Sequence, residues 1–235
     1  MAAETWFKFN GVSSETYGII VTEQPRIVRP KERVTSVTVP GRAGALTTTQ
    51  GENVFDPIDL TVRCVTPDAD RLSDIYAWLT GDGEIEFACR PGGVYKGRLI
   101  KKVEAARLVK GDPHRELALT FTCQPFWYPL NPQPITLTAS GATITNPGNM
   151  PSVPQIRVYG SGNISLTLDG TVDIEEVETG ILLDWEMGDA ISLDGGTLLN
   201  YKVDGGPQTI PTGTSAVIWT GDVTSVVITP NWRSL

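Results

Sequence analysis

The stretch "VPGRAGALTTTQG", Val39 to Gly51, combines three glycines with one arginine, a composition found in loops that cradle phosphate groups. A phosphate-binding loop of the common type would read G-x-x-x-x-G-K-S/T and would open a helix. This stretch has no lysine, and the residues after Gly51, "ENVFDPIDL", lead into a strand pattern. We therefore interpret the stretch as a connection between two strands, in which glycine supplies the positive φ angles.

The same stretch has a second interpretation, in which the connection is long because it reaches a neighbouring subunit. Thr47–Thr49 suit an extended strand or arm, and Arg42 can pair with a carboxylate of a partner. On this interpretation the candidate subunit-interface residues are Gly41, Arg42 and Gly44. An arm of this kind predicts association between copies of the chain.

Clustered carboxylates in "DIEEVE" could serve acid–base chemistry on a sugar. Their spacing, however, places the acidic residues opposite Val172, Ile174 and Val177, as on the solvated face of a strand. The single histidine, His114, lies among charged residues in a turn, and no G-x-S-x-G motif accompanies it. We therefore expect no catalytic residues and no enzymatic activity. The lack of a base–nucleophile pair argues against a hydrolase, which is the rival function.

The three cysteines, Cys64, Cys89 and Cys123, each fall within an alternating apolar pattern. We expect them to be reduced thiols that pack as small hydrophobic side chains. A metal site needs closely spaced ligands, which three scattered cysteines and one histidine do not supply. No metal and no cofactor is therefore expected.

Three tryptophans of the second half, Trp185, Trp219 and Trp232, are candidates for ligand contact. An exposed tryptophan on a β-sandwich can stack on a sugar ring, but sandwich cores also use tryptophan. Both interpretations are open. Ligand contact would suit a carbohydrate-binding adhesion module, which is the alternative function.

Charge divides the chain at about residue 130. Residues 1–130 contain 16 Lys/Arg and 16 Asp/Glu, whereas residues 131–235 contain 3 and 11, a net charge of −8. The step coincides with the proline-rich "YPLNPQPIT", a plausible linker. The sequence thus predicts two domains, 1–130 and 131–235. The acidic second domain lacks the cations needed to grip DNA phosphates.

No apolar run is long enough to span a membrane, and the N-terminus lacks the apolar stretch of a secretion signal, so we expect folding in a cytoplasm. In the first domain, alternating segments predict strands, among them "DPIDLTVRCV" and one long strand "VYKGRLIKKVEAARLV" with a bend near Gly97. A helix is expected near 67–80, with Thr66 as N-cap, Asp68 in its first turn, and an apolar stripe of four residues: Leu72, Ile75, Tyr76 and Leu79.

The second domain is expected to be almost all β. In "NISLTLDGTVDIEEVE", Asp169-Gly170 predicts a two-residue hairpin turn between two apolar-alternating strands. Further short strands separated by Gly/Asp turns are typical of a two-sheet sandwich. The predicted fold class is mainly β: a β-sandwich-like first domain with one α-helix, followed by a β-sandwich.

Several segments, in this order, resemble the distal tail protein family of long-tailed, siphovirus-type bacteriophages. They run from Phe7 to Leu235: "WFKFNG", "YGIIVTEQPRI", "VPGRAGAL", "IYAWLTGDGEIEF", "YKGRLI", "LTFTCQPFWYP", "TNPGNMPSVPQIRVYGSGNISLTLDG" and "TPNWRSL". The motifs are short, and their order and spacing carry the resemblance.

The resemblance implies a structural protein of the virion tail tip or baseplate, made and assembled in the host bacterial cytoplasm. In such a protein the N-terminal domain forms a ring, expected to be a hexamer, with an arm that clasps the neighbour. The C-terminal domain is a galectin-like β-sandwich. The implied partners are further copies of the chain, the tail tube protein, the tail-tip hub protein and a receptor-binding protein. DNA passes through the channel of the ring without specific binding.

Overall fold

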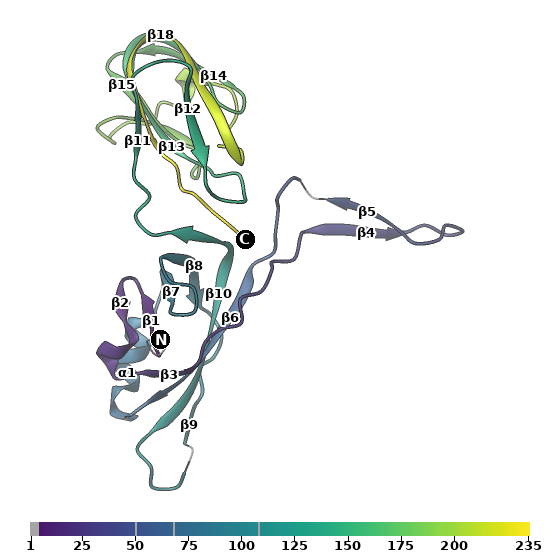
Figure 1. Cartoon of the computed structure of the whole chain (residues 1–235), viewed down its shortest axis with the longest axis vertical. Coiled ribbons are helices and arrows are strands. Elements are labelled where there is room, and N and C mark those ends of the chain that lie inside the picture. Colours follow the sequence, from purple (N-terminus) through teal and green to yellow (C-terminus); the bar gives the residue numbers. More distant parts are fainter. Residues whose placement is uncertain (1–4, 50, 68, 108) are drawn as a thin grey trace. The chain divides into compact units, whose positions relative to one another are not determined.

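The computed structural model describes residues 5–49, 51–67, 69–107 and 109–235, and the chain divides into two compact units. Unit 1 draws on residues 1–130 together with Leu235, and unit 2 on residues 131–234. The described residues are mainly β, with one α-helix, which confirms the predicted fold class (Figure 1). None of the helices among them is long and apolar enough to span a bilayer.

Unit 1 contains ten strands, one α-helix and two short 3₁₀ helices among its described residues. In chain order these are β1 (Phe7–Phe9), β2 (Val12–Ser13), η1 (Ser14–Tyr17), β3 (Ile20–Glu23), β4 (Val34–Thr38), β5 (Ala45–Thr49), β6 (Ile58–Thr66), η2 (Ala69–Arg71), α1 (Leu72–Trp78), β7 (Asp82–Phe87), β8 (Gly93–Leu99), β9 (Ala105–Arg107) and β10 (Arg115–Pro129).

Eight of these strands form one antiparallel sheet in the order β2-β1-β7-β8-β10-β6-β3, with β9 paired to β10. The backbone N–H of Val21, in β3, donates to the carbonyl of Thr5, just ahead of β1, at 2.9 Å. This bond joins two distant parts of the strand order, so the sheet curves back on itself. The enclosed core is aromatic: Phe7, Phe9, Phe87 and Phe121 are all at most 1% exposed.

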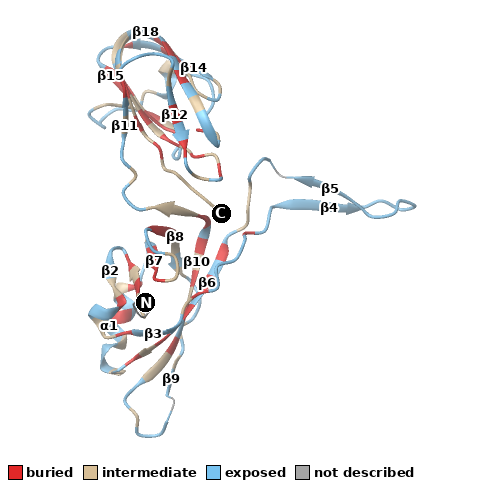
Figure 2. Ribbon diagram, viewed as in Figure 1, coloured by how far each residue is buried: buried red, intermediate tan, exposed pale blue. Residues whose placement is uncertain are grey.

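Strand β6 shows how the sequence directs this core. Its alternating face of Ile58, Leu60, Val62 and Cys64 is buried, as predicted, while the residues between them are mostly exposed (Figure 2). Alternation of this kind commits one face of a strand to the core and the other to water. The register against β10 follows from it.

The helix is shorter than predicted. Thr66 is the last residue of β6, not an N-cap, and α1 begins at Leu72 after the 3₁₀ turn Ala69–Arg71. Asp68 lies outside the described residues. Within the predicted stripe, Ile75 and Leu79 enter the core, but Tyr76 remains 37% exposed. A helix of two turns covers less of the sheet than the predicted span would.

The predicted single strand from residue 94 to residue 109 is also wrong. It is two strands, β8 and β9, separated at residues 100–104, and Gly97 lies inside β8, next to a shift in register between β8 and β10. A Cβ on Gly97 would approach the carbonyl oxygen of Thr122 to 2.7 Å and the Sγ of Cys123 to 2.8 Å. This glycine therefore allows close approach of two strands, a role that a sequence pattern does not distinguish from a bend.

Unit 2 is a β-sandwich built on two long strands. Its elements are β11 (Ile135–Leu137), β12 (Ala142–Asn146), β13 (Gln155–Thr167), β14 (Thr171–Val177), β15 (Gly180–Asp184), β16 (Asp189–Ser192), η3 (Asn200–Lys202), β17 (Val203–Asp204) and β18 (Gly213–Thr229). β13 and β18 pair along most of their length, with shifts in register near Gly160, and the remaining strands pair to their other edges or to each other. The strands of unit 2 surround one apolar interior (Figure 2).

The predicted hairpin of unit 2 is β13–β14. Its loop has three residues, Leu168–Gly170, rather than two, because Thr167 and Thr171 form the last pair of the ladder. Leu168 donates from its backbone N–H to the carbonyl of Gly170 at 3.0 Å. Three-residue loops are the next most common hairpin connection after two-residue turns.

Candidate assembly surface

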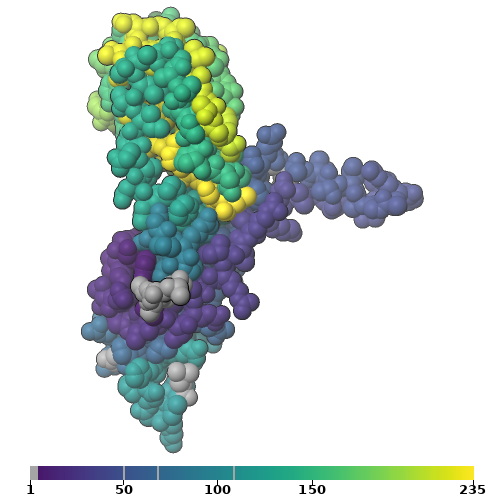
Figure 3. Space-filling model, viewed as in Figure 1, coloured from purple at the N-terminus to yellow at the C-terminus, as the bar shows by residue number. Residues whose placement is uncertain are grey.

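The most exposed element of unit 1 is a hairpin, β4–β5, which we call the arm (residues 34–49). Its strands pair only with each other, from Val34↔Thr49 to Thr38↔Ala45, and all ten strand residues are exposed. In the space-filling view, no other part of unit 1 covers the visible face of the arm (Figure 3). A two-stranded hairpin with no core of its own is marginally stable in water, which points to a partner.

The arm lies within an unusually long connection. Strands β3 and β6 are antiparallel neighbours, yet residues 24–57 separate them along the chain. Antiparallel neighbours are normally joined by about two to five residues. An excursion of this length, with its own secondary structure, is typical of a functional element.

Backbone and side-chain contacts fix the base of the arm. Arg33 donates from its backbone N–H to Val54 at 2.9 Å, and its Nε donates to Asp56 Oδ1 at 3.0 Å. Phe55 packs edge-on against Phe126 of β10, with ring centroids 5.9 Å apart. These contacts connect the base of the arm to the sheet of unit 1.

The two faces of the arm differ in chemistry. Residues that lie directly opposite each other in an antiparallel pair share a face, so Val37 and Leu46 lie together, and they are 50% and 46% exposed. Val39 follows just beyond the strand end and is 38% exposed. Thr35 and Thr48, which also pair directly, share this face. We call it the apolar face after Val37, Val39 and Leu46.

The opposite face carries hydroxyl groups. It includes Ser36 and Thr47, whose oxygens lie 3.2 Å apart in a hydrogen bond, and also Thr38 and Thr49, together with their pairing partners Ala45 and Val34. We call this the hydroxyl face. Its hydroxyl groups can hydrogen-bond with water, whereas exposure of Val37, Val39 and Leu46 to water is unfavourable.

The predicted interface residues Gly41, Arg42 and Gly44 lie together in the turn at the arm's tip. Gly41 and Gly44 have φ of +80° and +79°, in the left-handed region that glycine favours. Arg42 is exposed, and its backbone N–H donates to Val39 at 3.1 Å, which closes the turn. The structure therefore brings these three residues together; their contact with a partner stays a prediction.

Sequence reasoning missed a hollow of mixed polar and apolar lining elsewhere in unit 1. It has a volume of about 310 Å³ and lies where α1 ends beside the end of β8; its lining residues are Tyr76, Leu79, Thr80, Gly81, Leu99 and Val103. Ile100, next to Leu99, is 63% exposed. The signal of this hollow is Tyr76, which is exposed although the sequence pattern predicted it to face the core. This exposure becomes visible only once the helix is placed.

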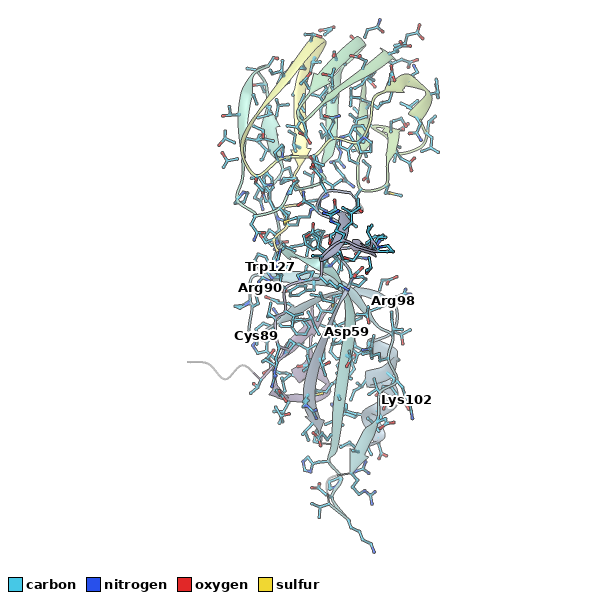
Figure 4. All side chains as sticks on the ribbon, turned by 90° about the vertical axis from the view of Figure 1, so that its right-hand side faces the viewer. Asp59, Cys89, Arg90, Arg98, Lys102 and Trp127 are labelled. Atoms are coloured by element: carbon cyan, nitrogen blue, oxygen red, sulfur yellow. The ribbon has the colours of Figure 1, made fainter. Side chains whose placement is uncertain are left out.

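Charged side chains near the hollow pair with one another. Arg98 binds Asp82 at 2.5 Å, and Lys102 binds Glu104 at 3.0 Å. Lys101 donates to Asp59 at 2.7 Å, and with Thr122 it holds the pKa of that carboxyl below its ordinary value. Figure 4 labels Asp59, Arg98 and Lys102. These groups form ion pairs of the kind that stabilise a surface.

A second cluster in unit 1 combines a cation with aromatic rings. The Arg90 guanidinium lies 4.8 Å from the ring centre of Trp127 and donates to the Tyr95 hydroxyl at 2.6 Å (Figure 4). Burial raises the pKa of Tyr95, and the bond from Arg90 opposes that rise. The tyrosine is thus held neutral as a packing group.

The tryptophans proposed for ligand contact are not exposed. Trp185 and Trp219 are 7% and 8% exposed and belong to the core of unit 2, and Trp232 is partly buried against the same core. Stacking on a sugar needs an open ring face, which burial denies to Trp185 and Trp219. Trp185 and Trp219 are therefore packing residues, and contact of Trp232 with a ligand stays a prediction.

The carboxylates and the histidine lie on the surface, as their patterns predict. Val172, Ile174 and Val177 are buried, Asp173 and Glu175 are exposed on β14, and Glu178 is exposed just after it. In an exposed turn, Asp112 Oδ1 accepts a bond from the backbone N–H of His114 at 2.9 Å and lies 2.5 Å from His114 Nδ1, and these two contacts lower the pKa of that carboxyl. Among the described residues, no cluster of three His, Cys, Asp or Glu side chains is arranged to hold a metal ion.

The fold as a whole is that of a phage hub protein from an adsorption apparatus. A solved structure matches 98% of this chain and 99% of its own, with a TM-score of 0.76 and 19% sequence identity. That structure is the Dit protein (gp 19.1) of SPP1, described as a paradigm of the hub adsorption apparatus in phages that infect Gram-positive bacteria. The resemblance to distal tail proteins is thereby confirmed at the level of the fold. No family model and no curated protein matches the chain.

Proposed function

We propose that this protein is a non-enzymatic structural component of a phage tail tip, where it forms a ring that joins the tail tube to the hub. The observation that carries the proposal is the whole-chain likeness to the SPP1 hub protein, which includes both units. The ring is proposed to be a hexamer, with a channel through which DNA passes. Other proposed partners are the tail tube protein, the tail-tip hub protein and a receptor-binding protein.

The arm supports self-association into a closed ring. A ring built from identical subunits needs two unlike surfaces on each subunit, one that meets the preceding copy and one that meets the next. The arm supplies one such surface, exposed and without a core of its own. Gly41, Arg42 and Gly44, at its tip, are proposed as interface residues.

Charge distribution supports the same role. The excursion that carries the arm, residues 24–57, has five Lys/Arg and three Asp/Glu, and the rest of residues 1–130 has 11 and 13. The excursion is thus +2 and the remainder −2, so a contact between the arm of one copy and the body of another is electrostatically favourable. Unit 2, with its net negative charge, is proposed to be solvated at the periphery.

The two buried cysteines of unit 1 have a packing role. Cys64 and Cys123 are buried, and burial raises the pKa of both thiols to about 12, which keeps them protonated and unreactive at neutral pH. The carbohydrate-binding alternative loses its stacking residues with the burial of Trp185 and Trp219. No observation favours a second function over the tail-tip role.

The test is the mass and shape of the protein with its neighbours. Light scattering and negative-stain electron microscopy should show a ring of six copies, formed by the protein alone or with tail tube and hub proteins. A protein that remains monomeric in all these mixtures would overturn the proposal, as would turnover of a substrate.

A further inference from the structure

We infer that residues 26–31, which we call the basic segment, are a docking site for an extended acidic segment of another protein, which pairs with their backbone as an added strand. The basic segment has the sequence Arg-Ile-Val-Arg-Pro-Lys and lies between β3 and the arm. The inference goes beyond the proposed function, because it concerns a partner other than a second copy and does not depend on ring formation.

The backbone of the basic segment lacks a partner over most of its length. From Gln24 to Lys31 the chain contains no helix, strand, turn or bend, and Figure 1 draws it as a plain trace between β3 and β4. The backbone groups of residues 26–29 form no hydrogen bond with another described residue. Unpaired N–H and C=O groups along a straight stretch of chain are the groups through which an added strand binds.

Both ends of this stretch are held in place. At one end Gln24 donates from Nε2 to the backbone carbonyl that precedes β1, at 3.1 Å, and Pro25 is buried. At the other end Pro30 is buried, and the carbonyl of Lys31 accepts from the backbone N–H of Asp56 at 2.8 Å. A segment with fixed ends loses little conformational freedom when a strand adds to its middle, which favours binding.

The side chains in the middle of the basic segment suit a strand with a partner. Ile27 and Val28 are β-branched, a type enriched in strands, and they are 42% and 46% exposed. Prolines and cations can protect an unpaired edge against association. Two adjacent exposed aliphatic residues do not serve that protection, and their exposure indicates a surface that a partner covers.

Charge selects an acidic partner. Residues 24–33 contain four Lys/Arg and one Asp/Glu, a net charge of +3 in a chain whose net charge is −8. Arg33 already belongs to an ion pair. The side chains of Arg26, Arg29 and Lys31 form no hydrogen bond or ion pair with any described residue. Carboxylates on an added strand would supply the charge-assisted hydrogen bonds that these cations lack.

The same charges disfavour two other occupants. If two copies of residues 26–29 paired antiparallel in full register, Arg26 of each copy would lie opposite Arg29 of the other, and like charges in that position are destabilising. Duplex DNA offers phosphates but no peptide groups for the unpaired backbone, and the net charge of −8 opposes its approach. An acidic strand satisfies both the cations and the backbone.

Binding of short peptides to the full-length protein tests the inference. The probe is the peptide Thr-Glu-Val-Val-Glu-Thr, labelled with a fluorophore at its N-terminus and amidated, whose two glutamates have the same spacing as Arg26 and Arg29. We expect saturable binding by fluorescence anisotropy, with a dissociation constant on the order of 0.1 mM. The matched peptide with lysine in place of both glutamates should bind about tenfold more weakly.

A charge swap tests the role of the two arginines. In the variant Arg26→Glu/Arg29→Glu, in which both exposed residues are reversed in charge, the lysine peptide should bind about tenfold more tightly than the glutamate peptide. The matched control is Arg42→Glu, an exposed arginine in the turn of the arm, which should leave the preference for glutamate unchanged. Thermal unfolding checks that each variant is folded. If the charge swap unfolds the protein, Arg26→Gln/Arg29→Gln replaces it and should abolish the preference.

A modified peptide tests the backbone part of the contact. The glutamate peptide with N-methyl groups on both valines keeps its charge but loses a backbone donor on either edge. It should bind to the wild-type chain about tenfold more weakly than the unmodified peptide, because strand addition depends on these donors.

The outcomes separate this inference from the proposed function. The inference is wrong if the glutamate peptide does not bind, if the lysine peptide binds equally well, or if N-methylation leaves binding unchanged. Displacement of the peptide by a short DNA duplex would also overturn it, because the segment would then be a general anion site. Loss of self-association in the charge-swap variant would instead assign the segment to contact between copies.

Light scattering of the same wild-type samples reports ring formation independently. Rings without peptide binding leave the proposed function intact and overturn the inference. Peptide binding by a chain that stays monomeric with tube and hub proteins overturns the proposed function and leaves the inference intact. Reversal of the preference in the charge-swap variant, together with weaker binding of the N-methylated peptide, supports the inference.

Discussion

Cys64 and Cys123 face the core of unit 1 from the neighbouring strands β6 and β10, with 0% and 1% of their surfaces exposed. Loss of water around a thiolate raises the pKa of each thiol from 9.0 to about 12. The same residue type at Cys89 is only half-buried. At the scale of the residue, environment rather than type decides reactivity.

These shifted pKa values predict loss of stability in alkali. Between about pH 9 and pH 12 an unfolded chain releases the two thiol protons, while the folded protein retains them, so the free energy of unfolding falls as pH rises. Each thiol contributes about 1.4 kcal/mol per pH unit in this window. Urea unfolding of unit 1 at about pH 8 and about pH 10.5 should differ by about 4 kcal/mol from these two groups. A Cys64→Ala/Cys123→Ala variant should lack this part of the slope; an unaltered slope would contradict the assignment.

At the scale of the element, the arm is separate from the core of unit 1. Its strands contribute no residue to the core of unit 1, although contacts at Arg33 and Phe55 hold its base. An exposed apolar face on an element that adds little to the stability of its own subunit suits contact with a partner.

Deletion of Ala43–Thr49 separates these two roles. The deletion removes β5 and the turn, and should abolish ring formation because the clasp is lost. It should change the free energy of unfolding of unit 1 by no more than about 0.5 kcal/mol, because no core residue is removed. A Gly/Ser replacement of equal length serves as the control for chain length. Intact rings by light scattering and electron microscopy would refute the assignment of the arm as a bridge between subunits.

At the scale of the whole molecule, the net charge of −8 bears on the proposed channel. A protein through which DNA passes must not hold the phosphates, and affinity for DNA depends on cations that release condensed counterions. Among the acidic residues, Asp173 and Glu175 are exposed on β14, and Glu178 is exposed just after its end.

The expected result is no detectable binding to a short DNA duplex. Fluorescence anisotropy at about 0.1 M salt should stay flat up to about 10 μM protein, because the net charge of −8 opposes accumulation of the chain on phosphates. A variant with Asp173→Lys, Glu175→Lys and Glu178→Lys, on a wet strand face, should gain salt-dependent binding. Tight binding by the wild-type chain would contradict a passive channel.

Some parts of the fold and the site could be predicted because they depend on local pattern. The buried face of β6, the wet face of β14 and the packing of the cysteines follow from alternation along a single strand. The glycines of the arm's turn could be predicted for the same local reason, since Gly41 and Gly44 adopt φ angles that other residues avoid.

Other parts of the fold could not be predicted, because they depend on which segment of the chain packs against a given residue. Gly97 suggested a bend but sits where β10 approaches closely, and Thr66 suggested a helix cap but completes a strand. Trp185 and Trp219 could not be assigned to core or surface until the sandwich was closed around them.

The sequence by itself determined that this protein is mainly β, that its charge changes near residue 130, and that an arginine lies among turn glycines, because composition and period are properties of the chain. Only the tertiary structure decided that "VTSVTV" and "ALTTT" pair with each other and with nothing else described in the chain. An alternating strand predicts that one face is buried, and here neither is. Burial is a relation between segments, so the exposed apolar face of the arm and the hollow beside α1 emerge only when all the other segments have taken their places.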